Sequence, residues 1–408
     1  MQVELLQWQM GRDASGGLVP GWCALPAGAA PLDRRGVPPD VATLVLCFGP
    51  TDRLLAEPVY PSLRARYPTA AIASCSSGTQ AFDADLDDDA VVASVIHLER
   101  SRLHAVCVPI GDAAQSHTCG AELGARLRAA DLAEDLALVL VLSDGSSVNG
   151  TRLVDGLGAA LGPAVPIVGG LAGDGARFQT TLVGLDEPAR PGQVVAIGLY
   201  GRELRHGAAA VGGWDAFGPP RRVTRASGNV LHELDGRPAL DLYEHYLGEE
   251  AEGLPGSALI YPLRIWQPDR PDTDLVRTVL AIDREARSMT FAGDIPEGWS
   301  AQLMRGNHDR LVAGAEQAAG TALAGLPAAD GSDTLALLVS CVGRRLLMGQ
   351  RTADEVEAVQ QAVQAQLGER ARCIGFYSYG ELAPRAASGV CELHNQTMTV
   401  TLLTEVMA

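Results

Sequence analysis

The chain has 408 residues, of which 47% are hydrophobic, so it is long enough for two or three globular domains with buried cores. Acidic residues outnumber basic ones by 49 to 32, which gives a net charge of -17. This balance argues against binding to nucleic acids or anionic membranes, because both are negatively charged. The sequence shows no apolar run of ~18 residues and no signal-peptide pattern, so it predicts a cytoplasmic protein without a membrane span.

The cysteines and histidines show no metal-binding spacing. None of the 8 cysteines forms a Cys-x-x-Cys pair, and most lie in apolar, strand-like runs. This is typical of buried thiols in a reducing compartment rather than of disulfides or a zinc site. The 8 histidines form no HExxH or similar array.

The first part of the chain contains one repeating unit. Residues 1–38 have little periodicity and are interpreted as an N-terminal arm. The expected elements of the first unit are a strand at 42–48, a helix at 52–67, a strand at 70–75 and a strand pair formed by 91–98 and 103–108.

The same order recurs twice. A helix expected at 116–130 precedes the second unit. That unit is expected to have strands at 136–142 and 165–169 around a helix at 151–161 capped by Asn149, a Gly-rich turn at 170–175, and strands at 178–185 and 193–200. The third unit is expected to have strands at 334–341 and 373–377, a turn at 342–345, a helix at 352–367, a turn at 378–381 and a final strand at 390–403. The segment 276–292 with a helix at 308–324 echoes residues 91–130.

This recurrence predicts the fold class. In each unit two apolar strands flank a helix, an arrangement that favours parallel pairing. The sequence therefore predicts an α/β fold with α+β elements, in which duplicated strand–helix–strand units form mixed sheets flanked by helices, in two related halves. The predicted domains are residues 39–225 and 226–408. Chance recurrence of a common α/β unit is the alternative explanation.

The turns that end the apolar strands are the candidate ligand site. Ligands bind beyond the carboxyl ends of strands in α/β sheets, and Gly-rich turns can hold anions with backbone N–H groups. The candidate ligand-binding residues are Ser76, Ser77, Gly170, Asp174, Tyr379 and Glu381 in these turns, with His394 and Asn395 in the last strand-like run. The alternative is that the glycines only permit tight turns.

Two further interpretations concern catalysis and haem. Cys75 or Ser76, together with His394 and Glu381, would supply a nucleophile, a base and a carboxylate, although the sequence contains no G-x-S-x-G elbow. A haem needs only one axial histidine in an apolar pocket. His206, which has Trp214 nearby in the sequence, is the candidate for that metal ligand, although a structural histidine is the simpler explanation.

The sequence resembles the FIST (F-box and intracellular signal transduction) family. Ser340–Leu346, Gly375–Glu381 and Glu392–Thr397 resemble its C-terminal part, whereas residues 40–225, including Gly169–Asp174, resemble its N-terminal part. The family is regarded as a sensory module for small ligands, and its bacterial members often lie beside kinases or cyclic-dinucleotide enzymes. A bacterial subset of free-standing members is described as haem-binding nitric-oxide sensors.

The resemblance therefore implies a small-ligand sensor for signal transduction and not an enzyme. The leading specific hypothesis is a haem-based nitric-oxide sensor that acts on a separate partner, either a histidine kinase or a diguanylate cyclase or phosphodiesterase. The alternatives are a sensor of a small metabolite such as an amino acid, without haem, and the enzyme with Cys75 or Ser76 as nucleophile. A scaffold that binds only proteins is a further possibility.

Overall fold

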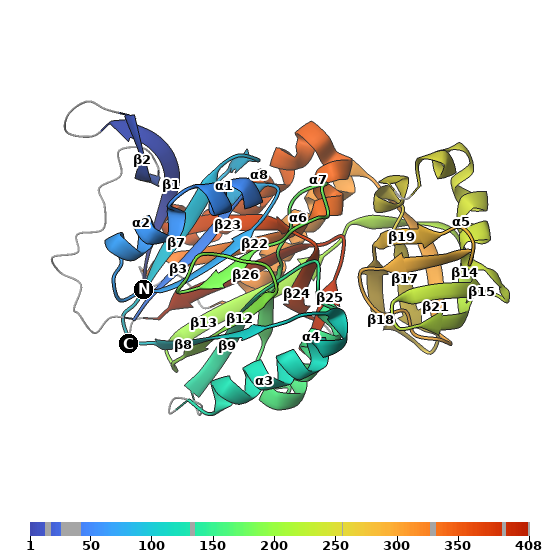
Figure 1. Ribbon diagram of the computed structural model, residues 1–408, viewed down its shortest axis with the longest axis horizontal. Helices are drawn as coiled ribbons and strands as arrows, with labels where there is room; N and C mark the ends of the chain where they lie inside the picture. Colours follow the sequence, from blue (N-terminus) through green and yellow to red (C-terminus); the bar gives the residue numbers. More distant parts are fainter. Residues whose placement is uncertain are drawn as a thin grey trace.

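The computed structural model describes residues 1–12, 18–25, 42–130, 135–254, 256–326, 332–385 and 389–406. It has a large body built on three mixed sheets and a smaller domain at one end, drawn in yellow and ochre in Figure 1. The expected α/β class with duplicated strand–helix–strand units is confirmed. The part of the expected arm at 26–38 lies outside the described residues.

Each sheet of the body has 6 strands. In order across the first sheet these are β11 (Val183–Leu185), β4 (Ala71–Ser76), β3 (Ala42–Gly49), β7 (Val91–Leu98), β1 (Gln2–Arg12) and β2 (Leu18–Leu25). The second sheet has β25 (Cys391–His394), β24 (Gly380–Pro384), β10 (Ile167–Leu171), β9 (Leu136–Ser143), β12 (Gln193–Tyr200) and β8 (Arg102–Pro109). The third has β13 (Leu204–Val211), β26 (Met398–Glu405), β22 (Thr334–Cys341), β23 (Ala371–Ser378), β5 (Gln80–Phe82) and β6 (Asp85–Asp87).

Each sheet contains one parallel strand pair among its described strands, as the sequence predicts. These pairs are β3 with β4, β9 with β10, and β22 with β23. The helices between the paired strands are α1 (Thr51–Ala56) and α2 (Val59–Arg66) in the first unit, α4 (Gly150–Leu161) in the second, and α7 (Val342–Met348) and α8 (Thr352–Leu367) in the third. Helix α3 (Ser116–Arg128) packs on α4, and α6 (His308–Ala324) packs on α8. Asn149 caps α4, because its side chain accepts a hydrogen bond from the N–H of Arg152.

The three units exchange strands in a cycle. After β4 the chain crosses to the third sheet, where β5 pairs with β23. After β10 it crosses to the first sheet, where β11 pairs with β4. After β23 it crosses to the second sheet, where β24 pairs with β10. Each unit therefore completes the sheet of another, which single-sequence patterns do not reveal.

The inner faces of the three sheets share one apolar core. The ring of Phe48 in the first sheet packs at a tilt against that of Phe376 in the third, with ring centroids 4.8 Å apart, and Leu140 of the second sheet belongs to the same buried cluster. The cavity left inside this core is only about 20 Å³, so it is filled by side chains and offers no room for a ligand.

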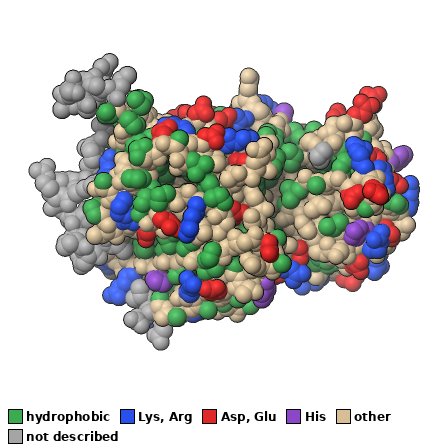
Figure 2. Space-filling model, in the orientation of Figure 1, with side chains coloured by type: hydrophobic (Ala, Val, Ile, Leu, Met, Phe, Trp, Pro, Cys, Tyr) green, Lys and Arg blue, Asp and Glu red, His purple; other side chains and the backbone are tan. Residues whose placement is uncertain are grey.

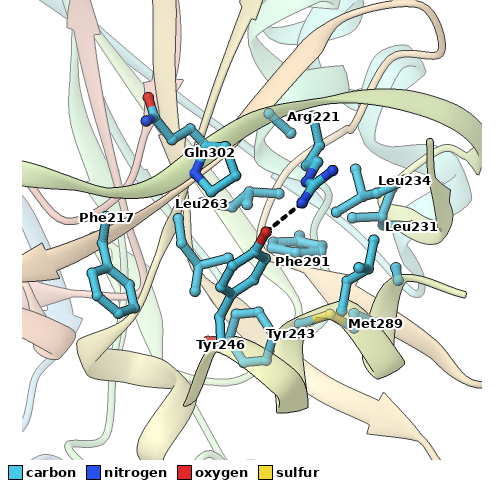
Figure 3. Close-up of a pocket in the computed structure, with 15 residues that line it drawn as sticks. Phe217, Arg221, Leu231, Leu234, Tyr243, Tyr246, Leu263, Met289, Phe291 and Gln302 are labelled. Carbon is cyan, nitrogen blue, oxygen red and sulfur yellow. Dashed lines mark hydrogen bonds between the residues drawn. The ribbon is translucent and has the colours of Figure 1, made fainter. Parts of the chain in front are cut away.

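The smaller domain, here called the inserted domain, occupies residues 214–306 between β13 and α6. Its elements are β14 (Trp214–Ser227), β15 (Val230–Leu234), β16 (Arg237–Pro238), α5 (Ala239–Leu247), two 3-10 helices at Gly248–Gly253 and Gly256–Ile260, β17 (Leu263–Gln267), β18 (Arg270–Arg277), β19 (Val279–Asp283), β20 (Ser288–Phe291) and β21 (Ser300–Gly306). It has its own apolar core, which includes Val223, Leu231 and Phe291. Figure 3 shows that side chains fill this interior around Tyr243 and Tyr246, and the space left is about 10 Å³.

Several local expectations are wrong. The helix expected at 52–67 is interrupted at Pro58, and the turn expected at 342–345 is the start of α7. Of the strand expected at 178–185, only the last three residues form a strand, β11. The expected echo of residues 91–130 fails, because residues 276–292 belong to the inserted domain. The domain boundary expected at 225–226 stays a prediction; these two residues lie within β14, and the core of the inserted domain includes Val223 and Leu231 on either side of them.

The strands at 91–98 and 103–108 do not pair with each other. Strand β7 lies in the first sheet and β8 in the second, so the chain crosses between sheets at Glu99–Ser101. The backbone N–H groups of Glu99, Arg100 and Ser101 all donate to the buried carboxylate of Glu405, at 2.8, 3.1 and 2.7 Å. Contact with the distant C-terminal strand thus replaces a hairpin turn.

The segment expected as one strand at 390–403 is two strands, β25 and β26, in different sheets. The chain turns between them at Gln396, which has a φ of 63°. A non-glycine residue rarely adopts this left-handed conformation, so the alternation of side chains along the segment gave no sign of the break.

The close approach of Gly78 to Gly175, where two of the strand-end turns cross, can be tested by substitution. A Cβ on Gly78 would lie 2.2 Å from the Cα of Gly175, which is backbone and cannot move aside cheaply. We expect Gly78→Ala to lower the free energy of unfolding by about 3 kcal/mol, the upper part of the range for overpacking. Denaturant unfolding followed by circular dichroism measures this change.

Gly158→Ala is the matched control. Gly158 lies in α4 and a Cβ there would meet no atom within 4 Å, so alanine should stabilise the helix by about 0.5–1 kcal/mol. Equal stability of the two variants would contradict the close approach of the two turns.

Candidate functional site

The turns that end β4, β10 and β23 meet one another, as the sequence-based site requires. Ser76 Oγ donates to the backbone oxygen of Gly173 at 2.8 Å and accepts from the N–H of Leu182 at 2.9 Å. Ser77 Oγ donates to the backbone oxygen of Tyr377 at 3.0 Å. Both serines are fully buried, so their hydroxyl groups hold the turns together.

Asp174 organises the loop that follows β10. Its carboxylate accepts hydrogen bonds from the N–H groups of Phe178, Gln179 and Thr180 at 2.8, 2.9 and 2.9 Å, and from the hydroxyl of Tyr379. Burial alone would raise the pKa of Asp174, but these hydrogen bonds outweigh it and lower the pKa below its usual value. The same contact with Asp174, added to burial, raises the pKa of Tyr379. The pair is therefore an anchored, ionised carboxylate with a neutral phenol.

Gly170, Glu381 and His394 lie in one row across β10, β24 and β25. The carboxylate of Glu381 is fully buried and accepts hydrogen bonds from Ser378 Oγ at 2.7 Å and from Thr397 N and Oγ1 at 3.1 and 2.9 Å. Burial raises the pKa of Glu381 to about 8 despite these donors. Glu381 is thus bonded to the chain on both of its oxygens.

His394 is partly exposed, whereas Asn395 is buried. The His394 ring contacts the backbone oxygen of Ala383 at 3.2 Å, and burial together with Arg277 and Arg385 lowers its pKa to about 4. Asn395 is 1% exposed, and its side-chain nitrogen and oxygen have no hydrogen-bond partner among the residues that the structure describes. A buried amide of this kind is a site where an ordered water fits.

A cavity of about 670 Å³ lies at the junction of the body and the inserted domain. The body contributes its strand-end turns and α7, and the inserted domain contributes the 3-10 helix Gly256–Ile260 and the segments around β19 and β20. The lining residues are Gly145, Ser146, Val148, Leu171, Ala176, Phe178, Gly256, Ser257, Leu259, Ile260, Val279, Leu280, Ala292, Leu346 and Tyr379. This volume is that of a typical small-molecule site, and domain junctions are where such sites often occur.

The rim of the cavity is apolar and exposed. Phe178, Leu280 and Leu346 line it and are 43%, 46% and 41% exposed, respectively. Figure 2 shows apolar side chains on both sides of the junction between the body and the inserted domain. Exposed apolar side chains that gather around a cavity favour a binding surface over chance.

Of the residues expected at the site, Tyr379 lines this cavity and Asp174 holds Tyr379 in place. Ser76, Ser77, Gly170, Glu381, His394 and Asn395 are absent from the lining. Sequence reasoning missed Phe178, Leu280 and Leu346. Phe178 follows a Gly-rich turn and so carried a weak signal, whereas an exposed leucine in a strand or helix carries none.

The nucleophile and haem candidates lie elsewhere. Cys75 is fully buried in the shared core of the sheets, and burial raises its pKa. His206 lies on β13 at the edge of the third sheet, where burial outweighs a hydrogen bond to the backbone of Ala137 and lowers its pKa. Within the described ranges, no three His, Cys, Asp or Glu side chains gather where they would hold a metal ion.

Comparison with known proteins identifies the family. Residues 43–237 match the FIST N domain and residues 239–384 match the FIST C domain. The chain belongs to the FIST family. FIST domains are small-ligand sensor domains of signal transduction. Among the helices that the structure describes, none is long and apolar enough to cross a membrane.

More distant likenesses add little to the FIST assignment. The chain is 25% identical over 291 residues to the uncharacterized protein MJ1623 of Methanocaldococcus jannaschii, which covers 64% of this chain and 52% of that protein. This chain therefore spans about half the length of the curated relative that it matches. A cyanuric acid hydrolase from A. caulinodans aligns with a TM-score of 0.37 and 9% identity, over 100% of this chain and 99% of that one. A chorismatase aligns with a TM-score of 0.35 and 11% identity, over 100% of both chains.

The buried carboxyl of Glu381 makes the stability of this FIST protein depend on pH. Its pKa is raised from 4.5 to about 8, so between these values the folded chain holds a proton that the unfolded chain has released. This stabilising contribution is complete below pH 4.5 and is lost as the pH rises towards 8, a change on the order of a few kcal/mol. We expect Glu381→Gln, which cannot ionise, to flatten this dependence in urea unfolding titrations between pH 4 and pH 9.

Glu316→Gln on the exposed side of α6 serves as the control and should retain the wild-type dependence. Parallel curves for wild type and Glu381→Gln would show that Glu381 is already ionised in the folded protein.

Proposed function

We propose that this FIST protein senses an uncharged, largely apolar small molecule that binds in the 670 Å³ cavity between the body and the inserted domain. The observation that carries the proposal is the chemistry of the lining. The described lining residues include no Lys, Arg, Asp, Glu or His, and their side-chain polar groups are the hydroxyls of Ser146, Ser257 and Tyr379. A charged ligand would lose its hydration there without gaining a partner charge.

Because the cavity lies between the body and the inserted domain, ligand binding can change how these two parts are placed. A ligand that contacts Leu346 of the body and Leu280 of the inserted domain has interactions that depend on how the two parts are placed. It therefore favours the arrangement in which it contacts both, and the shift equals its difference in affinity for the two arrangements. The inserted domain is also bonded directly to the body, since Gln396 Nε2 donates to the backbone oxygen of Leu259, a lining residue, at 2.9 Å.

The ligand-bound arrangement would be read by a signalling partner. On the family resemblance, that partner is a histidine kinase or a diguanylate cyclase or phosphodiesterase. An amino acid is a less suitable ligand than a neutral molecule, because an ammonium and a carboxylate group would both lack a charged partner among the described lining residues.

Haem does not fit the residues of this cavity. The described lining residues include no His, Cys or Met, and the hydroxyl of Tyr379 is already bonded to Asp174 and to the backbone oxygen of Gly175. The candidate axial ligand, His206, is absent from the lining. The proposal therefore names a ligand without iron.

The catalytic alternative also lacks its geometry. Cys75 lies in β4 of the first sheet, whereas His394 lies in β25 at an edge of the second and contacts Ala383. The hydroxyl of Ser76 is bonded to the backbone of Gly173. Neither nucleophile has a hydrogen bond to His394 or Glu381 among the described contacts.

Nile red, an uncharged apolar dye, tests the cavity. We expect its fluorescence to rise and shift to the blue on binding to the wild-type protein. Leu280→Glu places a charge on the apolar rim and should weaken binding at least about tenfold, because the charge must be desolvated when the dye binds. Leu55→Glu on α1 is the control, since Leu55 is also exposed, at 61%, but does not line the cavity. Absence of dye binding by the wild type, or equal loss in both variants, would overturn the proposal.

Titration with hemin tests separately whether the protein binds haem. We expect no Soret band that depends on His206, so wild type and His206→Ala should give the same absorption spectra after gel filtration. A stoichiometric Soret band in the wild type that disappears in His206→Ala would restore haem as the ligand.

A further inference from the structure

Phe178 combines two costly features at the rim of the cavity. Its backbone has a φ of 51°, in the left-handed region that bulky residues rarely adopt, and its side chain is 43% exposed. Glycine or asparagine satisfies such a backbone conformation at lower cost. An exposed phenylalanine contributes little to the core, so neither the backbone conformation nor burial accounts for this residue. Strained residues of this kind concentrate at ligand sites.

A set of hydrogen bonds holds Phe178 in this conformation. Its N–H donates both to Asp174 Oδ1, at 2.8 Å, and to the hydroxyl of Tyr379, at 3.1 Å. The Tyr379 hydroxyl donates in turn to Asp174 and lies 3.0 Å from the backbone oxygen of Gly175. The two rings are stacked, with centroids 4.8 Å apart and an interplanar angle of 16°. Two turns from different units thus build one rigid aromatic pair, and both rings line the cavity.

We propose that the Phe178–Tyr379 pair is a platform that selects planar aromatic ligands without net charge. The inference rests on the proposed function and narrows its ligand class. Aromatic rings prefer offset-stacked or edge-to-face contact with other rings, which adds to the gain from buried area. Leu280, Leu346 and Ile260 supply apolar surface elsewhere in the cavity, and Ser146 and Ser257 offer hydroxyl groups to a few polar ligand atoms.

Two uncharged probes of similar size but different shape test the platform. Acridine, used at about pH 8 where it is neutral, is planar, and 1-adamantanol is a cage. We expect the wild-type protein to bind both by isothermal titration calorimetry. Phe178→Leu keeps an apolar side chain but removes the ring, so it should weaken acridine binding about five- to tenfold and change adamantanol binding less than twofold.

Leu346→Ala is the matched control, because Leu346 lines the cavity and is 41% exposed but has no ring. It should weaken both probes by similar factors. Asp174→Asn, which weakens the support of the platform, should reduce acridine binding more than adamantanol binding.

The outcomes separate the two proposals. If the wild type binds both probes and Phe178→Leu affects them equally, or leaves acridine unchanged, the platform is wrong and the apolar cavity stands. If the wild type binds neither probe, the cavity is not a small-molecule site and both proposals fail. A protein partner seated on the apolar rim would then be the remaining explanation of the exposed side chains.

Discussion

The crossing of the three strand-end turns is the constraint on which the rest of the body depends. Gly78 of one turn approaches Gly175 of another so closely there that a side chain on Gly78 would overlap the backbone of Gly175. The hydroxyls of Ser76 and Ser77 bond the turn after β4 to the other two turns. Because each unit sends a strand into the sheet of another, no unit completes its sheet alone. The same crossing places Tyr379 and the loop after β10 in the wall of the cavity, so the strand exchange that builds the fold also forms the candidate site.

The junction with the inserted domain combines fixed polar contacts with an apolar void. Arg277 donates to the backbone oxygen of Leu393 at 2.9 Å, and Asn149 donates to Asp294 at 2.9 Å. These contacts tie the inserted domain to the body through groups that are specific in geometry. The cavity beside them leaves apolar surface without a partner, which a ligand would cover at a gain of roughly 25 cal/mol per Å². A junction held at some points and open at another is suited to a small change of placement on binding.

The sequence predicted what depends on local patterns and missed what depends on distant contacts. Apolar runs gave the parallel strands, and helical spacing gave 352–367, which are the bounds of α8. The helix at 308–324 was predicted with the bounds of α6, although the echo of residues 91–130 that placed it is wrong. The Asn149 cap was also predicted, because Asn at that position serves the following helix. The strand exchange, the crossing held by Glu405 and the break at Gln396 all depend on partners far away in the chain. The cavity escaped prediction for the same reason, since its wall comes from seven separate stretches of sequence, at 145–148, 171–178, 256–260, 279–280, 292, 346 and 379.

The polar C-terminal motif has a structural explanation that does not require a ligand. Between Ser378 and Thr397 the chain leaves the third sheet, passes through β24 and β25 of the second, and returns to the third as β26. Glu381 spans this excursion, because one carboxylate oxygen accepts from Ser378 and the other from Thr397. A leucine at this position would leave those donors buried without acceptors, at a cost of roughly 1–3 kcal/mol each. The motif thus marks the strand exchange in the third unit. The residues expected to contact the ligand, Tyr379 and Phe178, lie in the segments that lead into the exchanged strands β24 and β11.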